Sequence, residues 1–211
     1  MNPGAVIHHA VDVGLLALTL TGCAAMPFLA TGAAVPDLLL PVAAALAVSL
    51  QWWRCRRGFV VATPIEQPAL LLVTALVLLT AAAILGWGSL ATASRFWDGA
   101  AMWDWKTGLL TASPGLEQPA FRDPGVLCHS RDYPLLQPLL LALLERTTGH
   151  ARLLFPVLYL MQAALVLLGA RRGGASTAIA CLLALAFALT PMVLNPSSGG
   201  FDSGYADAFL A

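Results

Sequence analysis

Charged residues are scarce in this sequence. Only 10% of its 211 residues are Asp, Glu, Lys or Arg, whereas a soluble domain averages roughly 25%. Acidic and basic residues are equal in number, so the formal net charge is zero. A nucleic-acid-binding domain carries a basic surface, and nothing in this composition supplies one. We therefore expect neither an ordinary soluble domain nor a nucleic-acid partner.

Cysteine is also sparse, and its spacing excludes the common zinc motifs. The four cysteines, Cys23, Cys55, Cys128 and Cys181, fall in four separate segments without a CxxC or paired Cys/His pattern. We expect isolated thiols. The stretch LTGC ending at Cys23 matches a bacterial lipoprotein processing box. However, no Lys or Arg precedes it and apolar sequence follows it, so we favour a plain first helix over a signal peptide.

Long apolar runs are what the sequence has in abundance. Hydrophobic residues make up 59% of the chain, in blocks of about 18–25 residues, the length that a helix needs to cross a membrane. The pattern predicts an all-α, polytopic transmembrane protein with about five complete spans and the start of a sixth. The expected spans are residues 13–35, 38–53, 68–90, 153–170 and 175–194. Because the sixth run stops at residue 211, before it could cross, we expect an amino-terminal fragment.

Two short arginine-rich loops predict the orientation. Residues 54–57 contain three arginines after a Trp-Trp pair, and Arg171-Arg172 ends the fourth run. Short loops rich in arginine stay on the cytoplasmic side. The amino terminus is then cytoplasmic, and the large loop of about residues 91–151 lies outside. We divide the chain into two extra amino-terminal helices with their arginine loop, residues 1–67, and a core, residues 68–211.

The large outer loop gathers the polar residues. Six of the eleven acidic residues lie between Asp98 and Glu145, together with Lys106, the only lysine. Asp98 and Asp104 are candidate general bases, because a partly desolvated carboxylate has a raised pKa. The alternative is that both are solvated charges in an aromatic belt. We favour Asp98, which follows Trp97 at the end of a span, since Lys106 would keep Asp104 ionised and less basic.

Two short helices and an acidic residue beyond them complete the set of candidates. Residues 97–110 could form an interfacial helix. Residues 134–146 could lie along the membrane or form a buried core helix. In the second segment Asp132 precedes Pro134, a position that suits the amino terminus of a helix.

Asp207 enters the last apolar run, where an acidic side chain is a functional candidate. Lys106 and the loop arginines could hold a phosphate or contact lipid headgroups.

Three motifs in order carry a resemblance to a known family. They are WDGAAMWDWKTGLL, then DYPLLQPLLLALLERTTGHARLLFPVLYLMQAALVLLGARR, then GYADAFLA. The set resembles the first outer loop and following core helices of GT-C glycosyltransferases, which include protein O-mannosyltransferases and the aminoarabinose transferases of lipid A. The likeness covers residues 69–211. The family's acidic pair is Asp98-Gly99 here, and two extra helices precede the core.

The resemblance implies an integral enzyme of the bacterial inner (plasma) membrane that acts in the cell envelope. It would move a sugar, with inversion, from a polyprenyl-phosphate donor to an acceptor on the non-cytoplasmic side. Its partners would be the lipid-linked donor and membrane lipids; no cofactor is required by the motifs, and a divalent metal is compatible with them. The implied catalytic residue is Asp98 or Asp104, and the substrate-binding residues are Lys106, His129, Arg131, Asp132, Tyr133 and Asp207. The rival is a non-catalytic transport or envelope-assembly subunit with the same scaffold.

Overall fold

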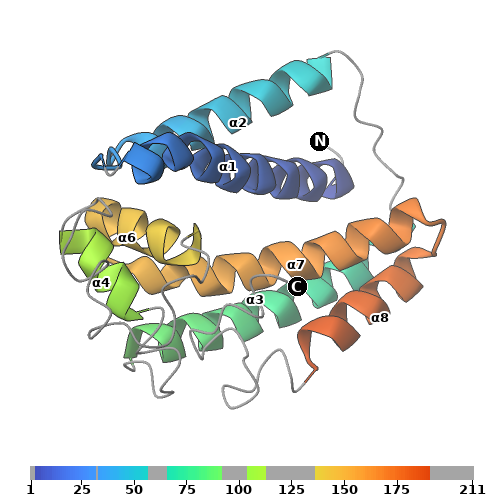
Figure 1. Cartoon of the computed structure of the whole chain (residues 1–211). Coiled ribbons are helices and arrows are strands. Elements are labelled where there is room, and N and C mark those ends of the chain that lie inside the picture. Colours follow the sequence, from blue (N-terminus) through green and yellow to red (C-terminus); the bar gives the residue numbers. More distant parts are fainter. Residues whose placement is uncertain (1–2, 32, 57–65, 92–103, 113–135, 191–211) are drawn as a thin grey trace.

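The computed structural model describes residues 3–31, 33–56, 66–91, 104–112 and 136–190, and every regular element within these ranges is a helix (Figure 1). The all-α prediction is therefore confirmed. In chain order the helices are α1 (Pro3–Thr31), α2 (Leu39–Arg56), α3 (Pro68–Ala91), α4 (Trp105–Ala112), α6 (Leu136–Thr148), the short 3-10 helix η2 (Ala151–Leu153), α7 (Leu154–Arg172) and α8 (Thr177–Ala188).

Two of the described helices are long and apolar enough to cross a membrane. They are Pro68–Gly88 in α3 and Ala151–Arg172, which covers η2 and α7. The apolar parts of α1 (His9–Ala25) and α8 (Thr177–Ala188) are shorter. The last turn of α2 carries Arg54 and Arg56, which lower its hydropathy. Two such helices also occur as core helices of soluble proteins, so the five spans remain a prediction.

The helices form two groups (Figure 1). The hairpin of α1 and α2 lies on one side of the bundle, and α3, α7 and α8 form the other, with α4 and α6 at one end. The first helix runs without interruption through Cys23, as expected of a plain helix. It approaches α7 closely at Gly14, where an added Cβ would lie 2.8 Å from Cε of Met161. An alanine at this position would require the flexible end of the Met161 side chain to shift.

The arginine-bearing ends of α2 and α7 lie at the same end of the bundle (Figure 1). This agrees with the alternation of spans that the two arginine loops predict. The helix α7 begins next to α6 at the opposite end and has 19 residues, a length of about 28 Å at 1.5 Å per residue. The two ends are thus separated by about the thickness of a hydrocarbon core, which is roughly 30 Å.

The helix α6 belongs to the core. Seven consecutive residues, Gln137 to Leu143, are buried. Leu140 and Leu141 pack with Phe155 and Tyr159 of α7, and Leu139 and Leu143 pack with Leu110 of α4. Of the two expectations for residues 134–146, the buried core helix is therefore correct. The periodicity could not decide between them because this segment is apolar on all sides, which suits burial all round.

Large apolar side chains cover the outside of several helices. Leu72, Leu76, Leu79 and Ile84 of α3 are each more than half exposed, and α2 and α8 expose similar rows. Exposed apolar side chains mark contact with lipid or with another protein where they form a contiguous surface. Trp87 lies near one end of α3 with 76% exposure, a placement typical of the aromatic belts of membrane proteins.

Gly149 provides a test of the turn that joins α6 to η2. Its φ is +72°, a left-handed conformation that costs a residue with a Cβ about 1–2 kcal/mol. We expect Gly149→Ala to lower the free energy of unfolding by that amount, measured in detergent by circular dichroism. The control is Gly108→Ala inside α4, where no neighbouring atom lies within 4 Å, and where alanine should stabilise by about 0.5–1 kcal/mol. Equal free energies of unfolding for Gly149→Ala and Gly108→Ala would contradict the left-handed conformation of Gly149.

Candidate functional site

Asp104 and Arg152 form an ion pair at the end of the bundle opposite the arginine-bearing ends (Figure 1). Asp104 directly precedes α4, and Arg152 lies in η2, just before α7. Nη2 of Arg152 donates to Oδ2 of Asp104. The Asp104 side chain is 30% exposed and that of Arg152 is 24% exposed. The pair is therefore half-buried, with part of each side chain exposed.

The turn after α6 holds Arg152 in place. The backbone N–H of Gly149 donates to the carbonyl of Glu145 at 2.8 Å, which closes the last turn of α6. Oε2 of Glu145 then accepts from the backbone N–H of Ala151, also at 2.8 Å. A carboxylate that bonds an orphan N–H at a helix start stabilises that start. Two short contacts from one helix end thus fix the position of η2 and of the arginine it carries.

The helix α4 holds Asp104 from the other side. It packs against α6 through Leu110, which is 1% exposed. Arg146 of α6 ties the far end of α4, because its Nη1 donates to the carbonyl of Leu110 at 3.5 Å. Its Nη2 donates to the carbonyl of Val35 at 3.1 Å, and its Nε lies 2.7 Å from Oδ1 of Asp37. One guanidinium therefore links α4, α6 and the segment between α1 and α2.

The pKa of Asp104 is raised above its ordinary value. Burial is the largest cause, because it disfavours the charged carboxylate, while the charge and the hydrogen bond of Arg152 act in the opposite direction. The sequence placed Lys106 as the cation beside Asp104, whereas the charge that lowers its pKa is that of Arg152 and burial outweighs it. Asp98 lies outside the described residues, so the ranking of the two aspartates as bases stays a prediction. Folding favours the protonated form, so the contribution of Asp104 to stability falls as pH rises above the ordinary pKa of 3.8.

Lys106 lies inside the structure. It is only 1% exposed and belongs to the buried side of α4. From the sequence we expected its ammonium to hold a phosphate or to contact lipid headgroups, and both roles stay predictions. Arg152 is the cation that contacts Asp104 and is partly open to solvent. We therefore assign the anion-binding role of the site to Arg152 in the proposal below.

Most of the other predicted site residues lie outside the described residues. These are Asp98, His129, Arg131, Asp132, Tyr133 and Asp207. Arg152 was missed by the sequence analysis, because 48 positions separate it from Asp104. The sequence position of Arg152 could have indicated that it belongs to the site. Arg152 lies three positions after the Thr148-Gly149 turn, on the same predicted side of the membrane as Asp104. Within the described ranges, no group of three or more His, Cys, Asp or Glu side chains could hold a metal ion.

A second polar network joins α1 to α2 near the arginine-bearing ends. The amide Nε2 of Gln51, a residue 3% exposed, lies 2.9 Å from Nδ1 of His9 and donates to Oδ2 of Asp12 at 3.1 Å. Nη1 of Arg54 donates to Oε1 of Gln51 at 3.3 Å. These side chains bond one another across the hairpin, so the network explains how two apolar helices are held in one register.

Comparisons with protein families, with curated proteins and with solved structures found no match to this chain.

Proposed function

We propose that this protein is a polytopic membrane glycosyltransferase of the GT-C type. It transfers a sugar from a polyprenyl-phosphate donor to an acceptor hydroxyl on the non-cytoplasmic side. The observation that carries the proposal is the half-buried Asp104–Arg152 pair at the start of a membrane-length helix. A carboxylate with a raised pKa beside a guanidinium, at the level of the headgroups, combines a base with a phosphate-binding group.

In the proposed reaction, Asp104 accepts the proton of the acceptor hydroxyl. The hydroxyl oxygen attacks the anomeric carbon of the sugar, and the bond between that carbon and the phosphate oxygen breaks. The electron pair leaves with the polyprenyl phosphate, whose added negative charge Arg152 stabilises. Because the attack comes from the side opposite the leaving group, the configuration at the anomeric carbon inverts. Asp98, seven positions after the end of α3 at Ala91, is the other candidate base.

The membrane part of the proposal is supported by the surface. The exposed apolar rows on α2, α3 and α8 suit an apolar solvent. Arg56 lies over the ring of Trp52 at 3.8 Å from its centroid, at the same end as Arg171 and Arg172. Tryptophan and arginine together at helix ends are typical of the cytoplasmic membrane boundary. The catalytic pair at the opposite end is then extracytoplasmic.

The experiment that tests the enzymatic part measures release of polyprenyl phosphate. Membranes carrying the protein as its gene encodes it are supplied with polyprenyl-phosphate-linked hexoses and pentoses and an extract of envelope acceptors. We expect release above that of membranes lacking the protein. The rival, a non-catalytic membrane subunit, would show no release with any of these donors. In that case the Asp104–Arg152 pair serves only to join α4 to η2.

Topology reporters test the orientation. Because the two arginine-bearing ends face the cytoplasm, a reporter fused at Gly173, between α7 and α8, should read as cytoplasmic. A reporter at Ser113, just after α4, should read as extracytoplasmic. The matched pair of alkaline phosphatase and green fluorescent protein at each site gives opposite signals and controls for expression. Identical readings from Ser113 and Gly173 would contradict the predicted number of spans.

Replacing Arg152 tests how the pair controls the base. Arg152 lowers the pKa of Asp104 by its charge and its hydrogen bond, so its removal raises that pKa further. The rate of transfer rises with pH as the base loses its proton. We expect Arg152→Gln to move this rise to higher pH and to raise KM for the donor, whereas Arg152→Lys should keep the rise near its parental position. An unchanged pH profile in Arg152→Gln would exclude Asp104 as the base.

A further inference from the structure

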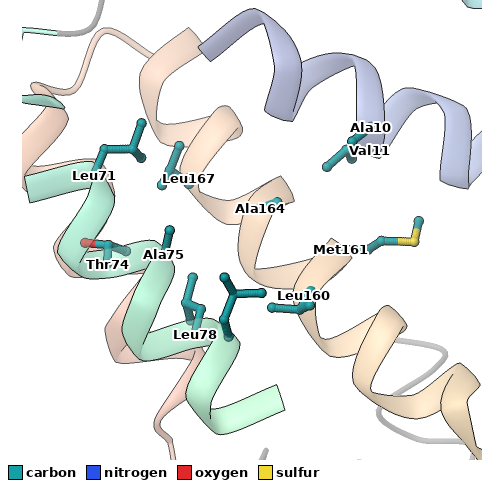
Figure 2. A pocket seen from close by; sticks show the side chains of 11 residues that line it. Ala10, Val11, Leu71, Thr74, Ala75, Leu78, Leu160, Met161, Ala164 and Leu167 are labelled. Carbon is teal, nitrogen blue, oxygen red and sulfur yellow. The ribbon is translucent and has the colours of Figure 1, made fainter. Parts of the chain in front are cut away.

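A groove separates α1 from α3 at the arginine-bearing half of the bundle (Figure 2). Its floor is α7, through residues between Leu160 and Leu167, and its walls are Ala10 and Val11 of α1 and the α3 residues from Leu71 to Leu79. The volume open to a ligand is about 370 Å³, within the range of small-molecule sites. The lining is aliphatic apart from Thr74, whose hydroxyl points away from the groove in Figure 2.

The basic end of the bundle lies directly beyond this groove. Arg171 follows Leu167 by four residues and so lies on the same face of α7. On the opposite wall, Asp12 follows Val11, and its Oδ2 lies 4.0 Å from Nη1 of Arg54. Within the described ranges this end carries four arginines, Arg54, Arg56, Arg171 and Arg172, against two carboxylates, Asp12 and Glu66. An apolar groove therefore leads to a region of net positive charge.

We propose that this groove binds one acyl chain of an anionic phospholipid, with the lipid phosphate at the arginine-bearing end. A flexible hydrocarbon chain suits a narrow aliphatic groove, and each arginine near a membrane surface attracts anionic lipid by about 1 kcal/mol. The site is distinct from the Asp104–Arg152 pair, which lies at the other end of the bundle. The inference rests on the membrane part of the proposed function and not on its chemistry.

Charge selects the occupant of the groove, because its aliphatic lining fits any hydrocarbon chain. An uncharged lipid fits the same hydrocarbon space but gains nothing from the four arginines. The charge at the end of the groove therefore selects the anionic headgroup.

Native mass spectrometry of the purified protein tests the proposal. The protein is extracted in detergent and offered dioleoyl phosphatidylglycerol or dioleoyl phosphatidylcholine at equal concentration. We expect one retained phosphatidylglycerol and much less phosphatidylcholine. Ala164→Phe, which fills the floor of the groove, should remove the retained lipid. Ala75→Leu is a second groove-filling variant, and Ala83→Phe on the exposed side of α3 is the matched control that should retain it.

Charge substitutions test the position of the headgroup. Arg54→Gln together with Arg171→Gln should lower phosphatidylglycerol retention by roughly fivefold for each arginine and leave phosphatidylcholine retention unchanged. Equal retention by the parent and both groove-filling variants would overturn the proposal. So would equal retention of the two lipids by the parent, or a protein dimer in place of bound lipid. Sugar transfer should stay at the parental rate in Ala164→Phe, so loss of lipid and loss of activity are separate outcomes.

Discussion

We expect Asp104→Asn to slow sugar transfer by a factor of about 10²–10⁴, the usual cost of removing a general base. Asparagine has nearly the shape of aspartate but cannot accept the proton of the acceptor hydroxyl. Its carbonyl oxygen can still accept a hydrogen bond from Nη2 of Arg152, so α4 and η2 should remain joined. The loss should appear in kcat, measured as polyprenyl phosphate released per minute, with expression and membrane insertion near those of the parent.

Two comparison variants make the Asp104 result decisive. Glu66→Gln removes a carboxylate that is 58% exposed and lies near Arg171, at the far end of the bundle, and it should transfer sugar at the parental rate. Asp98→Asn tests the other loop carboxylate. If Asp98→Asn alone is inactive, the enzyme proposal stands and Asp98 is the base. If both aspartate variants match the parent, the loop carboxylates take no part in chemistry and the enzymatic proposal falls.

Arg146→Ala should lower the free energy of unfolding by about 2–4 kcal/mol. The Arg146 side chain is only 12% exposed and bonds the carbonyls of Val35 and Leu110. Hydrogen bonds from a charged donor contribute about 1.5–3 kcal/mol each, and an orphaned buried carbonyl is costly. The loss should disconnect α4 and the α1–α2 hairpin from α6. Unfolding in mixed detergent and sodium dodecyl sulfate micelles, followed by circular dichroism, measures the change.

Arg146→Lys separates charge from geometry. A lysine ammonium keeps the attraction to Asp37, which lies 2.7 Å from Nε of Arg146, but cannot reach two carbonyls and a carboxylate in one plane as a guanidinium does. We expect it to recover less than half of the stability lost in Arg146→Ala. Full recovery would mean that only the charge matters. Asp37→Asn should cost little, because Asp37 is 62% exposed and ion pairs of exposed carboxylates contribute at most about 1 kcal/mol.

Several helix boundaries were predictable because local chemistry sets them. Residue 68 was the expected start of the third run, and α3 begins there, since proline suits the first turn of a helix. The fourth run was expected to end at Arg171-Arg172, and α7 ends at Arg172, with the left-handed Gly174 shortly after it. The first helix differs. It begins at Pro3 rather than near residue 13, and His9 and Asp12 of its added turns contact Gln51 of α2.

The sequence by itself determined that the protein is helical. It also predicted five membrane spans, and two of the described helices have the length and hydropathy of such a span. These properties follow from composition and spacing, which act locally or along one helix. The tertiary structure alone decided that Asp104 pairs with Arg152, that Lys106 is buried, and that α6 lies in the core. Each depends on contacts between different helices, where burial and partner charge come from neighbours in space and not from neighbours in sequence.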